Sequence, residues 1–226
     1  MLVAIPDVLT PEQVAEGRKA LESADWVDGR VTAGHQGAHV KHNRQLPQNS
    51  EAGRVVGEMI LRALSSNALF MSAALPLHVL APTFNRYESG EAFGYHVDGA
   101  MRFLPNGQRM RTDLSCTLFF CEPDEYEGGE LVIDDVFGSK SVKLPAGHMI
   151  VYPSTSVHQV TPVTKGARLS SFFWLQSMIR DNAQRAMLFD MDRAIQGLGA
   201  EAGATNPGVV QLTGIYHNLL RMWGEV

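Results

Sequence analysis

Apolar residues near the start of the chain recur every three or four positions, which is the spacing of one face of an α-helix. Residues 10–13, Thr-Pro-Glu-Gln, have the composition of a helix start: threonine caps, proline occupies the first turn and glutamine completes a capping box. A second helix is predicted over about residues 51–65, from the apolar positions Val55, Val56, Met59, Ile60 and Leu64. We therefore expect the N-terminal part to be helical.

Between residues 75 and 175 the pattern changes to short β-rich runs separated by glycine, proline and aspartate. The runs predicted to be strands cover residues 78–87, 113–121, 130–133, 141–144, 149–152 and 168–175. Many short strands with turns between them are typical of a β-sandwich or barrel. The open end of a small jelly roll of this kind would supply a cavity.

After Arg180 the helical pattern returns in two segments. One apolar stripe consists of Met187, Leu188, Met191, Ile195 and Leu198, and the other of Leu212, Ile215, Tyr216, Leu219, Leu220 and Trp223. The Gly/Ala-rich residues 197–208 are predicted to join them. We expect a mainly β fold with flanking α-helices: an N-terminal helical and lid segment (1–76), a β core (77–178) and a C-terminal helical extension (179–226).

The composition and charge of the chain argue against several classes of protein. A chain of 226 residues with 45% hydrophobic residues can bury a good core as one domain, and a net charge of -5 gives no support to nucleic-acid binding. The cluster Arg102, Arg109 and Arg111 is interpreted as a solvated loop. No apolar run reaches the length of a membrane helix, the N-terminus lacks the features of a secretion signal, and we expect a cytoplasmic protein. Cys116 and Cys121 are predicted to be reduced, because an odd separation along one strand puts them on opposite faces.

The most informative chemistry lies in His96, Asp98 and His158. The first two are two residues apart, so on an extended segment both side chains share a face. His158 lies in a segment interpreted as a strand leading into a turn. Two histidines and one carboxylate form the ligand set that leaves half of an iron coordination sphere open. The alternative is that His-x-Asp is an accidental surface pair.

Arg168 begins a predicted strand in which alternation puts four side chains on one face: Arg168, Ser170, Phe172 and Trp174. If that face lines the barrel, the arginine is buried and needs an anion. A dicarboxylate co-substrate could supply it through a bidentate pair. The alternative is an ion pair with Asp134, Asp135 or another acid at the rim.

Other polar residues allow two interpretations each. The hydroxyl of Tyr87 needs a partner if it is buried, and a co-substrate carboxylate or a backbone group could be that partner. His35, His39 and His42 have helical spacing, but no acid or cysteine joins them. A segment that lines the mouth of the active site is therefore favoured over a second metal site. Whether these histidines, Lys41 and Asn43 contact the substrate is left open.

Three ordered motifs resemble those of the Fe(II)/2-oxoglutarate dioxygenases of the prolyl-4-hydroxylase-like group. They are Tyr87-x-x-Gly90-x-x-Phe93-x-x-His96-x-Asp98, the glycine-rich turn at 127–131, and residues 147–153 leading to His158 and then Thr164-x-Gly166-x-Arg168. The flanking residues 41–46 and 212–221 resemble the bacterial PKHD-type hydroxylases, the PiuC/YbiX-like group. Together these similarities span nearly the whole chain.

The resemblance implies a double-stranded β-helix (jelly-roll, cupin-like) core, Fe(II) held by His96, Asp98 and His158, and 2-oxoglutarate held by Arg168. Tyr87 and Ser170 are further candidates for contact with the co-substrate. The resemblance also implies L-ascorbate as reductant and a link to iron homeostasis. The expected activity is hydroxylation of a C–H bond by dioxygen, with succinate and carbon dioxide as co-products.

The sequence does not identify the substrate. It could be a peptide that contains a proline, or a small molecule such as a free amino acid or a siderophore-like compound. A non-catalytic iron or 2-oxoglutarate sensor on the same fold is the alternative function. A zinc or manganese cupin-like enzyme is a third interpretation, which leaves Arg168 unexplained. The apolar C-terminal helix could cover its own core or a partner subunit, and the second case predicts a homo-oligomer.

Overall fold

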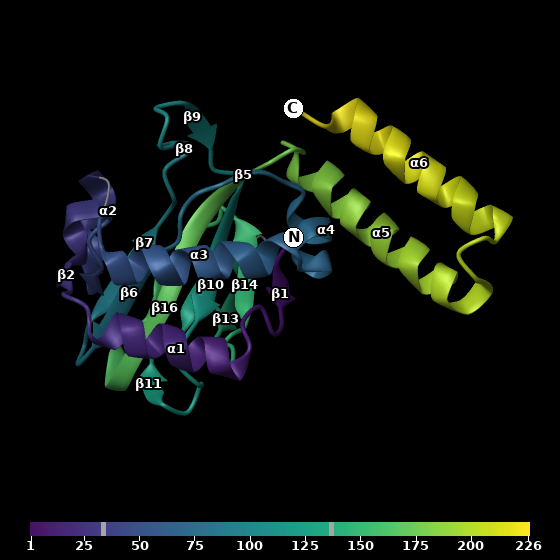
Figure 1. Ribbon diagram of the computed structural model, residues 1–226. Helices are drawn as coiled ribbons and strands as arrows, with labels where there is room; N and C mark the ends of the chain where they lie inside the picture. The colour runs from purple at the N-terminus through teal and green to yellow at the C-terminus, as the bar shows by residue number, and fades with distance from the viewer. Residues whose placement is uncertain (33–34, 136–137) are drawn as a thin grey trace.

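The N-terminal helix begins where its capping residues predict. The computed structural model describes residues 1–32, 35–135 and 138–226 (Figure 1). Helix α1 covers Pro11–Glu22, and its capping box is complete: the Gln13 backbone N–H donates to the Thr10 hydroxyl, and the Thr10 N–H donates to the Gln13 side chain. The predicted capping box is thus confirmed.

Helices α3 (Glu51–Ser65) and α4 (Ala68–Ala74) follow, and α1 and α3 lie side by side across one face of the larger sheet (Figure 1). The predicted bounds of α3 are confirmed, and Val56, Ile60 and Leu64 are buried. Val55, another of the apolar positions that predicted this helix, is 40% exposed. Helix α4 was not predicted, since its seven residues are too few to show a clear helical period.

Two antiparallel sheets form the core, counted over the described residues. The larger one contains β1 (Val3–Ile5), β2 (Val27–Asp28), β4 (Arg44–Gln45), β5 (Pro76–Val79), β6 (Thr83–Glu88), β10 (Leu114–Phe119), β11 (Tyr126–Gly128), β14 (Met149–Pro153) and β16 (Val163–Ser177). The smaller one contains β3 (Lys41–His42), β7 (Ala92–His96), β12 (Leu131–Asp135), β13 (Gly138–Val142) and β15 (His158–Val160). A hairpin of β8 (Met101–Phe103) and β9 (Arg109–Arg111) projects from the body (Figure 1).

The smaller sheet has the order β13-β12-β15-β7-β3, and the main path of the larger one is β1-β14-β10-β16-β6-β4-β2. Buried side chains from both sheets join one core cluster, for example Leu118 from β10 and Ile133 from β12. This arrangement is a jelly-roll core with flanking helices, so the predicted fold class is confirmed. The division at residues 76 and 178 stays a prediction.

Several predicted strands differ from the observed ones. The run 78–87 is two strands, β5 and β6, with Pro82 in the gap between them. The segment 152–160, predicted to be a strand leading into a turn, is the end of β14 and a turn, followed by β15, which begins at His158. Strand β16 begins at Val163, before the predicted start, and includes Gly166, whose φ is +74°. A Cβ there would lie 2.2 Å from the carbonyl oxygen of Glu125, so only glycine fits.

The C-terminal helices α5 (Asn182–Ala202) and α6 (Pro207–Trp223) form a hairpin that extends away from the sheets (Figure 1). A small cluster of Leu75, Ile179 and Leu188 attaches it to the body. Helix α5 continues through Gly197, so the predicted linker 197–208 was too long. A glycine destabilises a helix by only about 1 kcal/mol relative to alanine. The packing of α5 against α6 can offset this loss.

The structure also bears on two expectations from composition. Cys116 and Cys121 are both free thiols, as predicted, although Cys121 lies beyond the end of β10 and not in the same strand as Cys116. Within the described ranges, no helix has the length and apolar character needed to cross a membrane.

Candidate metal centre and cavity

A cavity of about 770 Å³ lies between the two sheets. Its walls come from β7 and β15 of the smaller sheet and from β6, β10 and β16 of the larger one. All the site residues predicted from the sequence line this cavity: Tyr87, His96, Asp98, His158, Arg168 and Ser170. The tertiary structure therefore brings together residues that are widely separated along the chain.

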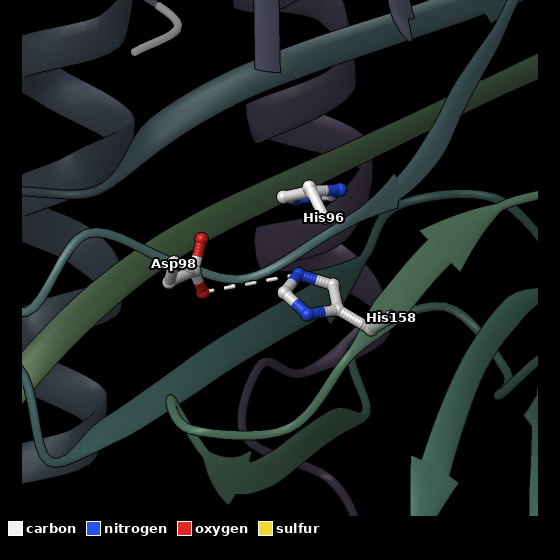
Figure 2. A group of neighbouring side chains, drawn as sticks. All are labelled: His96, Asp98 and His158. Carbon is white, nitrogen blue, oxygen red and sulfur yellow. Dashed lines mark ion pairs between the residues drawn. The ribbon is translucent and has the colours of Figure 1, made fainter. Parts of the chain in front are cut away.

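His96, Asp98 and His158 form the metal-binding candidate (Figure 2). His96 ends β7 and His158 begins β15, and the two are direct partners in the antiparallel ladder. Their ring centroids are 4.2 Å apart, and His158 Nε2 lies 3.8 Å from Asp98 Oδ2. The candidate ligand atoms of all three lie within 4.8 Å of one another. His96 is buried and Asp98 is half-buried, which disfavours the alternative of an accidental surface pair.

Backbone carbonyls orient both imidazoles. His96 Nδ1 lies 2.8 Å from the oxygen of Gly94, and His158 Nδ1 lies 3.0 Å from the oxygen of Ser156. A carbonyl can only accept, so Nδ1 carries the proton in each ring and Nε2 keeps its lone pair. Burial, and then the adjacent His158, lower the pKa of His96, which favours the neutral ring that a metal requires.

Ser115 holds the carboxylate of Asp98. Its hydroxyl donates to Asp98 Oδ2 at 2.6 Å and lies 2.8 Å from the hydroxyl of Ser154. Such support of a ligand from outside the metal sphere fixes its orientation. Ser115 was missed from the sequence, although a serine in the otherwise mostly apolar strand Leu-Ser-Cys-Thr-Leu-Phe was a signal.

We expect Ser115→Ala to weaken binding of a divalent metal ion about 10–100-fold, as loss of a ligand-orienting hydrogen bond typically does. Calorimetric titration with Zn(II) would measure this. Ser139→Ala is the matched control, because the Ser139 hydroxyl also donates to an aspartate, Asp134, at 2.6 Å on an exposed hairpin. Equal affinity in the two variants would show that Ser115 does not support Asp98.

Arg168 is 1% exposed in the middle of β16. Its Nη1 donates to Ser170 Oγ at 2.7 Å, whereas Nε and Nη2 are buried with no hydrogen-bond partner in the described structure. No acid among the described residues forms an ion pair with it, so the alternative of pairing with Asp134 or Asp135 is wrong. A buried guanidinium with two unsatisfied donor atoms is costly without an anion. It is suited to a carboxylate.

Tyr87 is the register partner of Arg168 on β6. The Arg168 guanidinium lies 5.3 Å from the centre of the Tyr87 ring. Burial raises the pKa of Tyr87, so its hydroxyl keeps a proton to donate. That hydroxyl accepts from Asn85 Nδ2 at 3.2 Å. Arg168, Ser170 and Tyr87 thus present several donors at one end of the cavity.

Lys41 lines the opposite wall, from β3. Its Nζ donates to Gln45 Oε1 at 2.7 Å and lies over the rings of Phe93 and Phe172. The pKa of Lys41 is lowered to about 8, mainly because the side chain is buried. Asn43 is buried but is not among the lining residues.

The short helices η1 (Gly29–Thr32) and α2 (His35–Val40) precede Lys41. Gln36 and Gly37 of α2 line the cavity, in keeping with a segment at its mouth. His35 and His39 belong to α2 but His42 lies on β3, so the three histidines do not share one helix. Within the described ranges, the only group of three or more residues that could hold a metal ion is His96, Asp98 and His158.

The arginine cluster predicted to be a solvated loop has three different environments. Arg111 forms ion pairs with Asp113 and Glu225. Arg102 lines the cavity, and its guanidinium lies 4.1 Å from the centre of the Trp174 ring. Only Arg109 is exposed as predicted. The prediction failed for the other two because their side chains reach Trp174 of β16 and Glu225 near the C-terminus, residues far from the hairpin in the sequence.

Sequence comparison connects the chain to two family profiles. Residues 82–176 match the 2OG-Fe(II) oxygenase superfamily, and residues 182–225 match the PKHD-type hydroxylase C-terminal domain. A curated PKHD-type hydroxylase of Methylobacillus flagellatus is 60% identical over 226 residues, which is 100% of both chains.

Solved structures share the fold at low sequence identity. HygX from Streptomyces hygroscopicus, solved with nickel and 2-oxoglutarate bound, has a TM-score of 0.54 and 14% identity over 78% of this chain and 82% of its own. A prolyl hydroxylase from Trichoplax adhaerens, in complex with a peptide fragment of hypoxia inducible factor, has a TM-score of 0.54 and 12% identity over 82% of this chain and 86% of its own. At such low sequence identity, these two structures show only that the fold is shared.

Proposed function

This chain belongs to the PKHD-type hydroxylases of the 2OG-Fe(II) oxygenase superfamily, and on that premise we propose that it hydroxylates a C–H bond of its substrate. One oxygen atom of dioxygen enters the substrate as a hydroxyl group. The other enters succinate, which forms with carbon dioxide from 2-oxoglutarate. The observation that carries this proposal is the presence, in one cavity, of the His96, Asp98 and His158 cluster and the unpaired guanidinium of Arg168.

Fe(II) fits the first of these features. Two neutral imidazole nitrogens and one carboxylate form the mixed donor set that suits this ion, and three coordination positions would remain open. The chemistry that bound iron supplies is activation of dioxygen, coupled to oxidative decarboxylation of the 2-oxo acid. Gly94, Ser156 and Ser115 keep the three donors oriented for that task.

2-Oxoglutarate fits the second feature. Arg168 offers Nε and Nη2, which have no partner of their own, to one carboxylate as a fork. We propose that Ser170 and Tyr87 bind beside it, because the Ser170 hydroxyl already contacts Arg168 and the Tyr87 hydroxyl remains protonated. These groups would orient the co-substrate and bury its charge.

We propose that aromatic residues of the cavity wall keep water away from the metal candidate. Phe93 stacks on His96 with ring centroids 3.6 Å apart, and Tyr152 meets His158 edge-on at 5.2 Å. A dry site strengthens the charge interactions within it and limits side reactions. We infer that these two aromatic side chains position the imidazoles as well as shield them.

We expect the protein, purified without metal and then given Fe(II), 2-oxoglutarate and ascorbate in air, to release succinate slowly even without added substrate. Turnover should be weak, because substrate binding normally completes and closes such a site. Zn(II) should inhibit, since it binds more tightly than Fe(II) and is redox-inert.

The control for this assay is Asp98→Ala under the same conditions. Equal succinate from both proteins would mean that free iron produces the signal. If the parent yields none even with cell extract as a source of substrate, a non-catalytic iron or 2-oxoglutarate sensor is the better proposal. A zinc or manganese enzyme would be favoured if those ions supported turnover and Fe(II) did not.

The finer points of the function rest on the family resemblance. We propose L-ascorbate as the reductant and a cytoplasmic location. The substrate is proposed to be a peptidyl-proline-like group or a small molecule related to iron uptake. The predicted homo-oligomer is supported only by exposed apolar side chains on the C-terminal hairpin, such as Ile215 and Met222.

A further inference from the structure

Arg102 is a cation of the cavity that the proposed chemistry does not use. It extends from β8, and its guanidinium stacks on Trp174 at 4.1 Å from the ring centre. Its Nε is buried and has no hydrogen-bond partner, and no acid in the described ranges forms an ion pair with it. A buried donor of this kind costs free energy unless a ligand satisfies it.

The position of Arg102 separates it from the co-substrate end of the cavity. Arg168 and Trp174 are on the same face of β16 but six residues apart, which corresponds to about 20 Å along a strand. Trp174 pairs with Ser115, whose hydroxyl holds Asp98. Arg102 therefore lies toward the Asp98 side of the cavity, whereas the guanidinium of Arg168 lies beside the rings of Tyr87 and Phe119. The two arginines thus lie against different aromatic residues of the cavity wall, and the proposed co-substrate site uses Arg168.

The surroundings of Arg102 combine positive charge with apolar surface. Lys41 lines the same cavity and is close enough for the charge of Arg102 to contribute to lowering its pKa. Val97 and Met101 also line this part of the cavity, and both are about half exposed. The guanidinium lies over the ring of Trp174, and this contact restricts its position before an anion binds.

We infer that the substrate of this enzyme carries a carboxylate, which Arg102 binds at the mouth of the cavity, next to an apolar portion that contacts Val97 and Met101. This inference rests on the proposed function, because it assumes that 2-oxoglutarate occupies the Arg168 end. It makes Arg102 a specificity-determining residue, because a neutral analogue would lose the charge-assisted pair that a carboxylate forms with the guanidinium.

The test uses two probes of equal shape and different charge, 3-phenylpropanoate and 3-phenylpropanamide. Each is titrated by ligand-observed NMR into full-length protein loaded with Zn(II) and saturating 2-oxoglutarate, so that the Arg168 end is filled and no turnover occurs. We expect the parent to bind the carboxylate about tenfold more tightly than the amide, as a charge-assisted pair predicts. Arg102→Gln should remove this preference, and Arg102→Lys should restore part of it.

Arg109→Gln is the matched control, since Arg109 lies on the other strand of the same hairpin and is exposed. It should keep the preference, and all variants should bind 2-oxoglutarate and unfold on heating as the parent does. A preference that persists in Arg102→Gln, or a parent that shows none or binds neither probe, would overturn the inference. Because binding is read with Zn(II), this outcome is independent of succinate formation, which tests the oxygenase activity itself.

Discussion

Replacement of His96, Asp98 or His158 by alanine is expected to abolish tight Fe(II) binding, with a loss of affinity greater than about 100-fold. Removal of a group that only orients a ligand typically costs 10–100-fold, and each of these changes removes a ligand itself. The three donors come from two strands and one loop that already lie together, so no other described residue is placed to replace the lost one. Anaerobic calorimetric titration of Fe(II) into each variant measures the effect.

His148→Ala is a suitable control, because His148 lies outside the cavity and its ring faces Asp7 at 3.4 Å. Circular dichroism should show that all four variants keep the fold, since the large apolar cluster is untouched. Iron affinity equal to that of the parent in all three cavity variants would refute the assignment of the ligands.

Arg168→Gln is expected to raise the concentration of 2-oxoglutarate needed for half-saturation about tenfold to a hundredfold. The change removes a charge-assisted pair worth about 1.5–3 kcal/mol. Lysine at this position should recover only part of the loss, because it lacks the planar fork. Iron affinity should stay unchanged, since Arg168 is not among the metal-ligand candidates.

A second readout separates binding from structure. The protein without co-substrate should not lose stability in Arg168→Gln, because the change removes a buried cation that lacks a carboxylate partner. The rise in melting temperature that 2-oxoglutarate causes in the parent should be reduced in the variant. Arg86→Gln is the control, since Arg86 lies on the adjacent strand and pairs with Glu88. Parental co-substrate binding in Arg168→Gln would instead indicate a structural arginine.

Local signals in the sequence predicted the helices and most of the strands. The capping box at Thr10 and the apolar spacing of α3 depend only on residues within one or two turns, so they could be read directly. The strand boundaries were less accurate. The gap at Pro82 and the positive φ of Gly166 are local, but their effects depend on which neighbouring strand accepts the hydrogen bonds.

Only part of the candidate site could be predicted, because some of its contacts also depend on which strands pair. Motif spacing and the family resemblance identified His96, Asp98, His158 and Arg168. Nothing in the spacing indicated that Ser115 would hold Asp98 or that Arg102 would stack on Trp174. Both contacts join segments whose relative position is set by strand pairing. For Arg102, composition alone had indicated a solvated loop.

The sequence by itself thus determined the local elements, the jelly-roll class and the chemical types of the ligands, because capping, periodicity and motif spacing act over short stretches of chain. Only the tertiary structure decided that His96 and His158 are cross-strand partners and that Arg168 is buried without a carboxylate. These facts follow from the register of strands far apart in the chain, and a shift of one residue would turn a side chain to the other face of the sheet.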